Sequence, residues 1–317
     1  MLAAADSGDQ VDPQKLFVVR WQSMPPELTA AELVSARALI ALALTEDLGD
    51  RGDLTSRALI DPDESGEVAV VARQPGVVAG QPVARLVFDQ LDPRVRWTTQ
   101  RPDGSAVESG SVVATLAGPV AALLSGERTA LNFVTHLSGI ATLTLQFVTA
   151  LAASRAKIYD TRKTLPGWRL LEKYAVRAGG GSNHRLGLYD GILIKDNHLA
   201  AWSRAGGGRS IAAAIAAARD SAPAGVCVEV EVDTLEQLRE CLPARPDIVL
   251  LDNMSCEQMR EAAAWRDARA PGVLLEASGG VTLTTVGKIG QTGVDRISSG
   301  ALTHSAVALD LAFDWRN

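Results

Sequence analysis

Five cationic side chains lie close together in the middle of this sequence, each at or near the end of an apolar run or a glycine-rich turn. They are Arg162, Lys163, His184, Arg185 and Lys195. The chain as a whole is acidic, with a formal net charge of −6, so this excess of positive charge is local. A local cationic cluster in an acidic protein predicts a pocket for a small, highly charged anion.

The alternative is that these side chains form ordinary surface salt bridges, which is the better interpretation of any one of them alone. For the five side chains taken together, Lys195 argues against the salt-bridge interpretation. This lysine follows the buried-type run 192–194, where a lysine without a partner is unfavourable. Arg162 and Arg185 suit bidentate recognition of a carboxylate or phosphate. Lys163 and Lys195 are point charges that suit a phosphate or a developing negative charge.

Carboxylates mark two apolar runs further along the chain. Glu229, Glu231 and Asp233 alternate with valines, so one face of that predicted strand is acidic. Such a face is ordinary in a solvated antiparallel strand. Inside a parallel sheet it is unfavourable unless the acids meet cations, a metal or ligand hydroxyls. Asp252 ends the run 248–251 in the same way, and a pair such as Glu231 and Asp252 suits ribose hydroxyls or a magnesium ion that keeps some of its waters.

Small-residue loops follow two successive late strands, at 276–281 and 297–301. Their glycines let backbone N–H groups approach an anion closely, and paired late loops of this kind form the phosphate site of many barrels. His304 lies near the second loop and could reach a phosphate. His136 and His198 have contexts more typical of structural side chains, and no HxxxH or HExxH spacing indicates a zinc site.

The first part of the chain predicts a small α+β domain over residues 29–131. A capping box, Thr29-Ala30-Ala31-Glu32, precedes a run with helical periodicity at 33–44. Short strands separated by Gly, Pro and Asp turns are predicted at 67–73, 76–78, 94–99 and 111–116. A helix is predicted at 126–151. The alternating pattern near the C-terminus predicts that residues 306–317 form a strand that returns to the first domain's sheet.

Residues 132–305 predict a second domain in which short apolar strands alternate with helices. We expect strands at 157–160, 191–195, 226–232, 248–252, 273–277 and 294–298, and helices at 211–219, 235–241, 256–268 and 283–290. The alternation implies parallel, right-handed βα units, and polar residues at the strand ends are how an α/β barrel builds its site. Six clear strands do not support a regular eight-stranded barrel.

The composition is that of a globular chain, 47% hydrophobic and 21% charged. No apolar run reaches the roughly 18 residues that span a bilayer. The acidic balance and the few aromatic residues argue against nucleic-acid binding. We interpret residues 1–28 as a disordered tail, because the start is polar and lacks the basic residues of a secretory signal. Cys227, Cys241 and Cys256 suit reduced thiols in a cytoplasmic protein rather than disulfides or a zinc knuckle.

Five motifs in this sequence resemble those of the quinolinate phosphoribosyltransferases, the carboxylating nicotinate-nucleotide pyrophosphorylases of NAD biosynthesis. The motifs are Glu127-Arg128-Thr129-Ala130-Leu131-Asn132, Asp160-Thr161-Arg162-Lys163-Thr164, Gly181-Ser182-Asn183-His184-Arg185, Lys195-Asp196-Asn197-His198 and Leu251-Asp252-Asn253. The match runs in order from about Leu33 to Leu311. It implies an N-terminal α+β domain, an open, irregular parallel α/β barrel, and a homodimer or higher oligomer in which the first domain of one subunit covers the barrel of the other.

The resemblance also implies a reaction. Quinolinate, a pyridine with two adjacent carboxylates, would attack the ribose of phosphoribosyl pyrophosphate through its ring nitrogen as pyrophosphate leaves with Mg²⁺. Loss of CO₂ would then give nicotinate mononucleotide. We expect catalysis mainly by positioning and electrostatics.

The resemblance assigns the site residues by position. The anionic pocket would comprise Arg162, Lys163, His184, Arg185 and Lys195, with Arg128 supplied across the dimer interface. The ribose and magnesium region would comprise Glu231 and Asp252, and the phosphate end Ser278, Gly279, Gly280, Ser299, Gly300 and His304. The catalytic residues among them would be Lys163, Lys195, Glu231 and Asp252.

Three other functions stay open. A related pyridine phosphoribosyltransferase whose substrate has one carboxylate would need fewer cations. A barrel lyase or isomerase would use Lys195 to form a Schiff base. A non-catalytic sensor would bind nicotinate mononucleotide and release no pyrophosphate. The glycine-rich insertion Ala205–Arg209 is expected to be peripheral under each of these functions.

Overall fold

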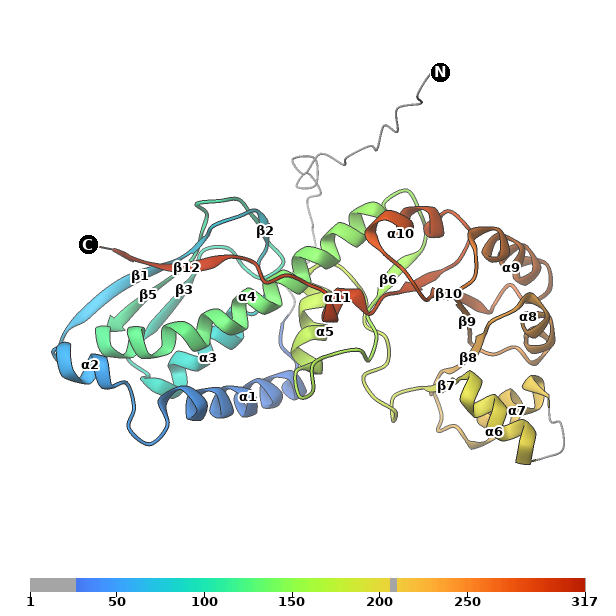
Figure 1. The fold of residues 1–317 in the computed structure, drawn as a ribbon, viewed down its shortest axis with the longest axis horizontal. Helices are drawn as coiled ribbons and strands as arrows, with labels where there is room; N and C mark the ends of the chain where they lie inside the picture. The colour runs from blue at the N-terminus through green and yellow to red at the C-terminus, as the bar shows by residue number, and fades with distance from the viewer. Residues whose placement is uncertain (1–26, 206–209, 317) are drawn as a thin grey trace, which may run out of the picture.

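The computed structural model describes residues 27–205 and 210–316 (Figure 1). Most of the expected tail, residues 1–26, lies outside the described residues, as does most of the insertion at 205–209. Two parts lie side by side along the long axis of the molecule, and one long helix, α4 (Val120–Ala150), runs from the first part to the second (Figure 1).

The first helix, α1 (Ala30–Leu48), begins at the predicted capping box. The Thr29 hydroxyl accepts from the backbone N–H of Glu32, and the Glu32 carboxylate accepts from that of Thr29 at 2.8 Å. The helix continues four residues past the predicted end at Leu44, through polar residues that face solvent, and stops at Gly49, whose φ is +49°. The same Glu32 pairs with Arg177, so the cap also ties α1 to the second part of the molecule.

The first sheet is antiparallel, with the strand order β12-β1-β5-β3. Its members are β1 (Ser65–Ala72), β3 (Arg96–Thr99), β5 (Val112–Pro119) and β12 (Leu311–Arg316). The C-terminal strand β12 therefore lies at the edge, paired with β1. A separate two-stranded ladder joins β2 (Gly76–Val77) to β4 (Ala106–Val107).

Helices α3 (Gln81–Leu91) and α4 pack side by side against one face of this sheet, and α2 (Leu54–Leu59) lies at its far end (Figure 1). The sequence analysis missed α3. It begins after Gly80, which has a φ of +96°, and Pro82 occupies its first turn, where the missing backbone N–H costs no helical hydrogen bond.

Helix α4 is long and apolar enough to meet a length-and-composition test for a membrane span, although it contains no uninterrupted apolar run of that length. The helix is 31 residues long and contains an 18-residue window with a mean hydropathy of 1.3. Of that window, 56% is buried inside the molecule, and the core helix of a folded domain passes the same test. Ser, Thr and Gly residues lie between the apolar residues of α4, so the helix contains no long uninterrupted apolar run.

The second sheet is parallel throughout, with the strand order β6-β11-β10-β9-β8-β7. Its six strands match the six predicted: β6 (Lys157–Tyr159), β7 (Ile192–Ile194), β8 (Val228–Val232), β9 (Ile248–Asp252), β10 (Leu274–Ser278) and β11 (Arg296–Ser298). Within the described residues β6 and β7 stay unpaired with one another, so the barrel is open.

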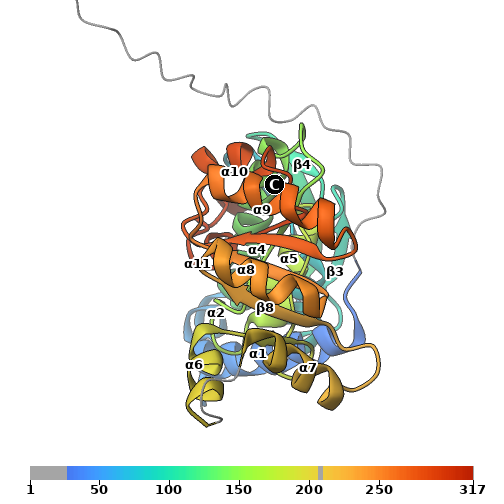
Figure 2. The ribbon, with the colours of Figure 1, turned by 90° about the vertical axis from the view of Figure 1, so that its right-hand side faces the viewer.

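Helices cover the outside of this sheet, as alternating βα units require (Figure 2). They are α6 (Asp196–Ala205), α7 (Ile211–Ser221), α8 (Leu235–Cys241), the 3₁₀ turn η2 (Leu242–Ala244), α9 (Cys256–Arg269) and α10 (Leu283–Gly290). Two further helices, α5 (Arg169–Ala178) and α11 (Ala301–His304), lie beside α4, between the two parts of the molecule (Figure 1). The predicted helices correspond to α7, α8, α9 and α10. Helices α5 and α6, which flank the cationic motifs, were not predicted from the sequence.

The approach to β12 depends on one glycine of α4. A Cβ atom at Gly139 would lie 2.2 Å from the carbonyl oxygen of Val307 and 2.9 Å from Cα of Ala308. The backbone N–H of Leu309 then donates to the carbonyl oxygen of Thr135 at 3.0 Å. The C-terminal segment therefore crosses α4 in direct backbone contact before it joins the first sheet.

We predict that Gly139→Ala lowers the free energy of unfolding by roughly 1–3 kcal/mol, because the added methyl group meets backbone that cannot turn aside. Urea unfolding measures the change. Gly272→Ala is the control, since no atom lies within 4 Å of its Cβ position. Equal stability of the two variants would contradict the close contact of α4 with the C-terminal segment.

Candidate active site

A cavity of about 670 Å³ opens at the carboxyl edge of the second sheet, and we call it the strand-end cavity. It brings together residues that are far apart in the sequence; most lie at or just after the ends of the parallel strands, and His184 and Arg185 come from the segment before β7. With the exception of Arg128, every residue that the resemblance implied lines it: Arg162, Lys163, His184, Arg185, Lys195, Glu231, Asp252, Ser278, Gly279, Gly280, Ser299, Gly300 and His304.

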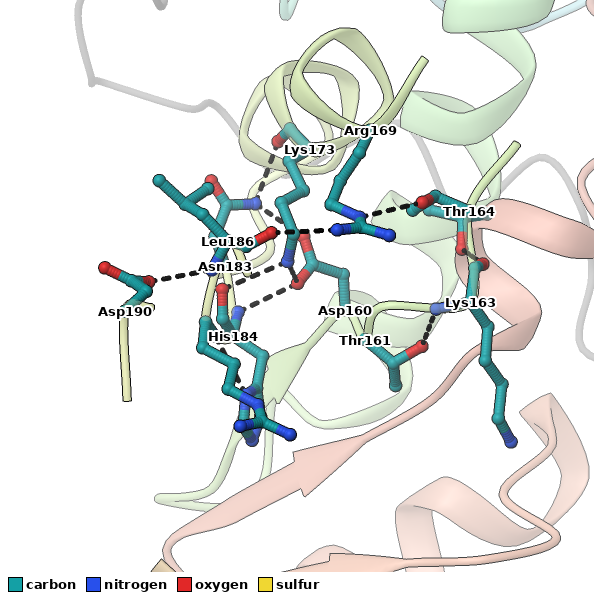
Figure 3. Close-up of polar contacts among 12 residues, drawn as sticks. Asp160, Thr161, Lys163, Thr164, Arg169, Lys173, Asn183, His184, Leu186 and Asp190 are labelled. Atoms are coloured by element: carbon teal, nitrogen blue, oxygen red, sulfur yellow. Dashed lines mark hydrogen bonds and ion pairs between the residues drawn. The ribbon is translucent and has the colours of Figure 1, made fainter. Parts of the chain in front are cut away.

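The loop after β6 and the end of the segment 182–185, His184 and Arg185, line one side of the cavity. Figure 3 shows the polar contacts between these two segments and α5. The Thr161 hydroxyl accepts from the backbone N–H of Lys163 at 3.0 Å, which turns the loop back toward the sheet. Arg169 of α5 joins the two segments, because it donates to the Thr164 hydroxyl at 3.1 Å and to the carbonyl oxygen of Leu186 at 3.2 Å. Helix α5 thus holds both cationic motifs.

Arg162 and Arg185 project from these two segments as neighbouring like charges. Partial burial and the nearby Arg162 guanidinium lower the pKa of Arg185 below its ordinary value. Arg185 donates to the carbonyl oxygen of Gly191 at 3.0 Å, which uses part of its donor set. Within the described residues, Arg162, Lys163 and Arg185 form no ion pair with a carboxylate, so their charge is available to an anion in the cavity.

His184 lies against two buried carboxylates. Its Nε2 is 3.2 Å from Glu229 and 3.3 Å from Glu276, while its Nδ1 accepts from the backbone N–H of Arg185 at 2.8 Å. Burial alone would lower the pKa of His184, but the two carboxylates outweigh it and raise the pKa to about 9. The two carboxylates therefore favour the protonated ring, at the cost of the bond that Nδ1 accepts from the backbone N–H of Arg185. Both ring nitrogens face protein groups even though the ring lines the cavity.

The same three side chains are the one group of possible metal ligands found within the described residues. The sequence analysis found no zinc spacing, and it did not foresee that the fold would bring these ligands together. Arg296 lies 2.6 Å from the second oxygen of Glu276 and stacks over the ring of Tyr159. Two cationic groups therefore face the two carboxylates, and the cluster is best described as internal charge pairing.

On the other side of the cavity, Lys195 forms an ion pair with Glu231. The Lys195 side chain is 45% exposed, whereas the Glu231 side chain is 9% exposed. Asp252, at the end of β9, accepts from the Asn253 amide at 2.8 Å. Asn253 has a φ of +53°, an uncommon conformation that turns the chain sharply at the edge of the cavity.

Two glycine loops close the far end of the cavity. Gly279 and Gly280 have positive φ values of 89° and 58°, and a Cβ at Gly279 would meet the Asn253 side chain at 2.2 Å. A Cβ at Gly300 would lie 2.7 Å from Cδ of Lys163, so the absence of a side chain lets the lysine cross this loop. Both loops line the cavity, and the backbone of the second loop lies close to a cation.

Arg128 lies elsewhere in its own chain. It is exposed on α4 and lines a smaller cavity of about 230 Å³, together with residues of α1 and Trp168. No part of it lines the strand-end cavity. If this arginine serves such a cavity, that cavity belongs to another copy of the chain.

The structure adds residues that the sequence analysis did not select as site residues. Glu276 and Asn253 line the cavity, and the buried pair of Asp160 and Lys173 lies behind it. Glu276 sits between Leu275 and Ala277 in a buried strand, which was a visible signal of the same kind as Glu229. Lys173 could not be recognised as a buried charge in the same way, because the helix that carries it, α5, was not predicted.

Comparisons with known proteins agree with this geometry. The family model for the quinolinate phosphoribosyl transferase N-terminal domain matches residues 53–138, and that for the C-terminal domain matches residues 140–314. The chain belongs to the quinolinate phosphoribosyltransferase family. The resemblance inferred from five motifs is confirmed across both domains.

Relatives of this family match over nearly the full chain. A nicotinate-nucleotide pyrophosphorylase [carboxylating] of Mycobacterium leprae is 46% identical over 291 residues, which cover 90% of this chain and 99% of that protein. A probable enzyme of the same name from Bacillus subtilis is 47% identical over 269 residues, 85% of this chain and 89% of that protein. The solved nicotinate-nucleotide pyrophosphorylase of Francisella tularensis has a TM-score of 0.83 at 35% identity, covering 93% of this chain and 99% of that chain. The predicted fold, an α+β domain with an open parallel barrel, is confirmed.

The charge cluster around His184 makes the stability of this member of the quinolinate phosphoribosyltransferase family depend on pH. Because the pKa of His184 is raised on folding, its contribution to stability is complete below pH 6.5 and is lost as the pH rises through about 9. We predict that the free energy of unfolding falls by roughly 1–3 kcal/mol over this range.

Glu276→Gln should weaken that pH dependence, because it removes one of the two carboxylates that stabilise the imidazolium. Urea unfolding at pH 6.5 and pH 9 measures the difference between the variant and the unaltered chain. Glu257→Gln on the exposed face of α9 is the control and should keep the full dependence. An unchanged slope in Glu276→Gln would show that His184 is neutral in the folded protein.

Proposed function

We propose that this chain transfers the phosphoribosyl group of phosphoribosyl pyrophosphate to quinolinate with decarboxylation. The products would be nicotinate mononucleotide, pyrophosphate and CO₂, the reaction of the quinolinate branch of NAD biosynthesis. The observation that carries the proposal is the pair of neighbouring guanidinium groups, Arg162 and Arg185, which share one cavity with two open glycine loops. A ligand with adjacent carboxylates at one end and phosphates at the other matches this distribution of donors.

The cationic side supports recognition of two carboxylates rather than one. Arg162 and Arg185 repel one another when the site is without an anion, so a dianion gains from both at once. Lys163 adds a flexible third charge at the same loop. This surplus of unpaired cations favours quinolinate over nicotinate, which has a single carboxylate.

A divalent magnesium ion fits the acidic side of the cavity. Glu231 and Asp252 are hard oxygen donors on adjacent strands, both at the cavity wall, although Lys195 already occupies one oxygen of Glu231. Mg²⁺ typically takes one or two carboxylates and completes its shell with water and substrate phosphates. When bound, it would neutralise the charge of the departing pyrophosphate.

The chain's own residues would act by orientation and electrostatics. The cationic side would align quinolinate so that its ring nitrogen faces the anomeric carbon of the ribose, where the new C–N bond forms as the C–O bond to pyrophosphate breaks. The glycine loops and Lys163 would hold the phosphates. Loss of CO₂ then leaves an electron pair on the ring carbon next to nitrogen, which takes up a proton. The cationic side stabilises the negative charge throughout.

A direct assay tests the proposal. We predict that the purified protein releases pyrophosphate and CO₂ from quinolinate and phosphoribosyl pyrophosphate when Mg²⁺ is supplied, and that chelation of Mg²⁺ stops the release. Nicotinate should be a poor substrate, because it leaves a cation without its partner, at roughly 3–5 kcal/mol per broken buried pair. Comparable turnover of both acids would mean that the second carboxylate is not recognised.

We also propose that the active unit is a cytoplasmic homodimer, or a higher oligomer, in which Arg128 of one chain enters the strand-end cavity of the other. What supports this is the location of Arg128 on α4, exposed and outside its own chain's cavity. A small anionic ligand surrounded by Arg128, Arg162 and Arg185 would then be enclosed by both chains.

Mixed dimers test the shared site. Arg128→Ala and Lys195→Ala should each reduce activity by on the order of 10²-fold or more, the scale for loss of one preorganised electrostatic contact. After subunit exchange, mixed dimers contain one cavity with both residues intact, so activity should return to about a quarter of the unaltered level in an equal mixture. Mixed dimers that form and remain inactive would exclude a shared site.

A further inference from the structure

Behind the strand-end cavity, Asp160 and Lys173 form an ion pair with no exposed surface (Figure 3). Asp160 directly follows β6, and Lys173 projects from the middle of α5. Neither side chain lines the cavity. The family resemblance gave neither residue a role, and the proposed reaction does not use either of them directly.

The Asp160 carboxylate joins the two segments that carry the cavity's cations. One oxygen accepts from Lys173 and from the backbone N–H of His184, the latter at 2.8 Å. The other oxygen accepts from the side-chain amide of Asn183 at 2.6 Å. The backbone N–H of Asp160 also donates to the carbonyl oxygen of Ser182 at 3.1 Å. A single residue therefore fixes the spacing between the loop after β6 and the segment 182–185.

Lys173 completes the attachment from the helix side. Its ammonium group donates to the carbonyl oxygen of His184 at 3.0 Å, so the pair holds both backbone polar groups of His184. The Asn183 amide also donates to the backbone carbonyl oxygen of Lys173 at 2.9 Å. His184 and Arg185 consequently have little freedom to move relative to Asp160, and Arg162 is only two residues further along that loop.

We infer that Asp160 and Lys173 are positioning residues. They set the distance between two pairs of cations, Arg162 and Lys163 on the loop after β6 and His184 and Arg185 on the segment 182–185. That distance in turn determines the affinity for a dianionic substrate. The inference rests on the proposed function. Like-charged guanidinium groups drift apart unless the backbone that carries them is fixed, and a buried charged network fixes it at several points. A shift of about 1 Å in such a group costs on the order of 10²-fold in function.

Stability alone does not account for this pair. Burial raises the pKa of Asp160 and lowers that of Lys173, so desolvation opposes both charges and the ion pair offsets it only in part. An apolar pair of similar size would often be at least as stable. What an apolar pair would lack is the set of directed bonds to His184 and Asn183.

Quinolinate binding, measured by calorimetry on the full chain well below its melting temperature, tests the inference. Asp160→Asn and Lys173→Met should each weaken quinolinate binding by about 10- to 100-fold, and each leaves a buried charge without its partner, so each should also lower the Tm. The double variant leaves no unpaired charge, so its Tm should recover toward the original value while quinolinate binding stays weak. Recovery of binding together with Tm would show a purely structural role and overturn the inference.

Arg266→Met is the matched control for loss of a buried ion pair. Arg266 is 2% exposed and pairs with Asp295 at the amino ends of β10 and β11, the end of the sheet opposite the cavity. The Tm of the Arg266→Met variant should fall, while its affinity for quinolinate stays within about threefold of that of the unaltered chain. A loss of affinity as large as that of Asp160→Asn would mean that any buried pair has the same effect.

Asn183→Ala covers the case in which the charged variants do not fold. It keeps the ion pair and removes three bonds of the Asn183 side chain: those that it donates to the second oxygen of Asp160 and to the carbonyl oxygen of Lys173, and the one that it accepts from Arg177. We expect a smaller loss of quinolinate affinity than for the charged variants, about 3- to 10-fold. Unchanged affinity in this variant would overturn the inference. If the unaltered chain itself failed to bind quinolinate, the proposed function would be wrong. If the unaltered chain bound quinolinate and the variants bound it equally well, only the positioning role would be wrong.

Discussion

The strands of the second sheet all run in one direction, and the location of the site depends on this constraint. Parallel strands present all their carboxyl ends at the same edge, so the loop after each one begins at the rim of the same cavity. Residues of all six strands, or of the segments that directly follow them, line this cavity, together with His184 and Arg185 from the segment before β7. The right-handed βα connections place the helices outside, which leaves the rim free for polar groups.

The interior of that sheet divides the charged residues into two groups. Four charged groups lie deep enough that each requires an opposite charge nearby: Glu229, Glu276, His184 and Arg296. They form ion pairs with one another, although Glu229 Oε1, both Glu276 oxygens and Arg296 Nε have no hydrogen-bond partner in the part of the chain that the structure describes. Arg162 and Arg185 lie at the rim and have no carboxylate partner within the described residues. The two internal carboxylates and the two internal cations thus balance one another in charge. The excess positive charge is concentrated at the rim of the cavity, where a ligand can reach it.

Much of this arrangement could be predicted from the sequence, because it depends on local patterns. Apolar runs located all six parallel strands, and Thr29 with Glu32 located the start of α1. The polar residues that follow those runs fell at the cavity, as parallel strands require. Helix α3 was not predicted, and α4 begins at Val120, six residues before its predicted start at Gly126.

Pairings between distant residues could not be predicted in the same way. The sequence indicated that Lys195 needs a partner, but it did not identify Glu231, which lies 36 positions away. The two carboxylates at His184 come from β8 and β10, and their convergence depends on the order of strands in the sheet. Such contacts follow from topology, which a periodic pattern does not specify.

The pairing of β12 with β1 has a consequence for how the protein is made. Arg316 and Glu67 face each other across these two strands although they are 249 positions apart. During synthesis β1 therefore emerges from the ribosome long before its edge partner exists, with a row of unpaired backbone groups exposed. The N-terminal sheet can be completed only after the barrel has been translated, so the part of the chain made first is among the last to reach its final form.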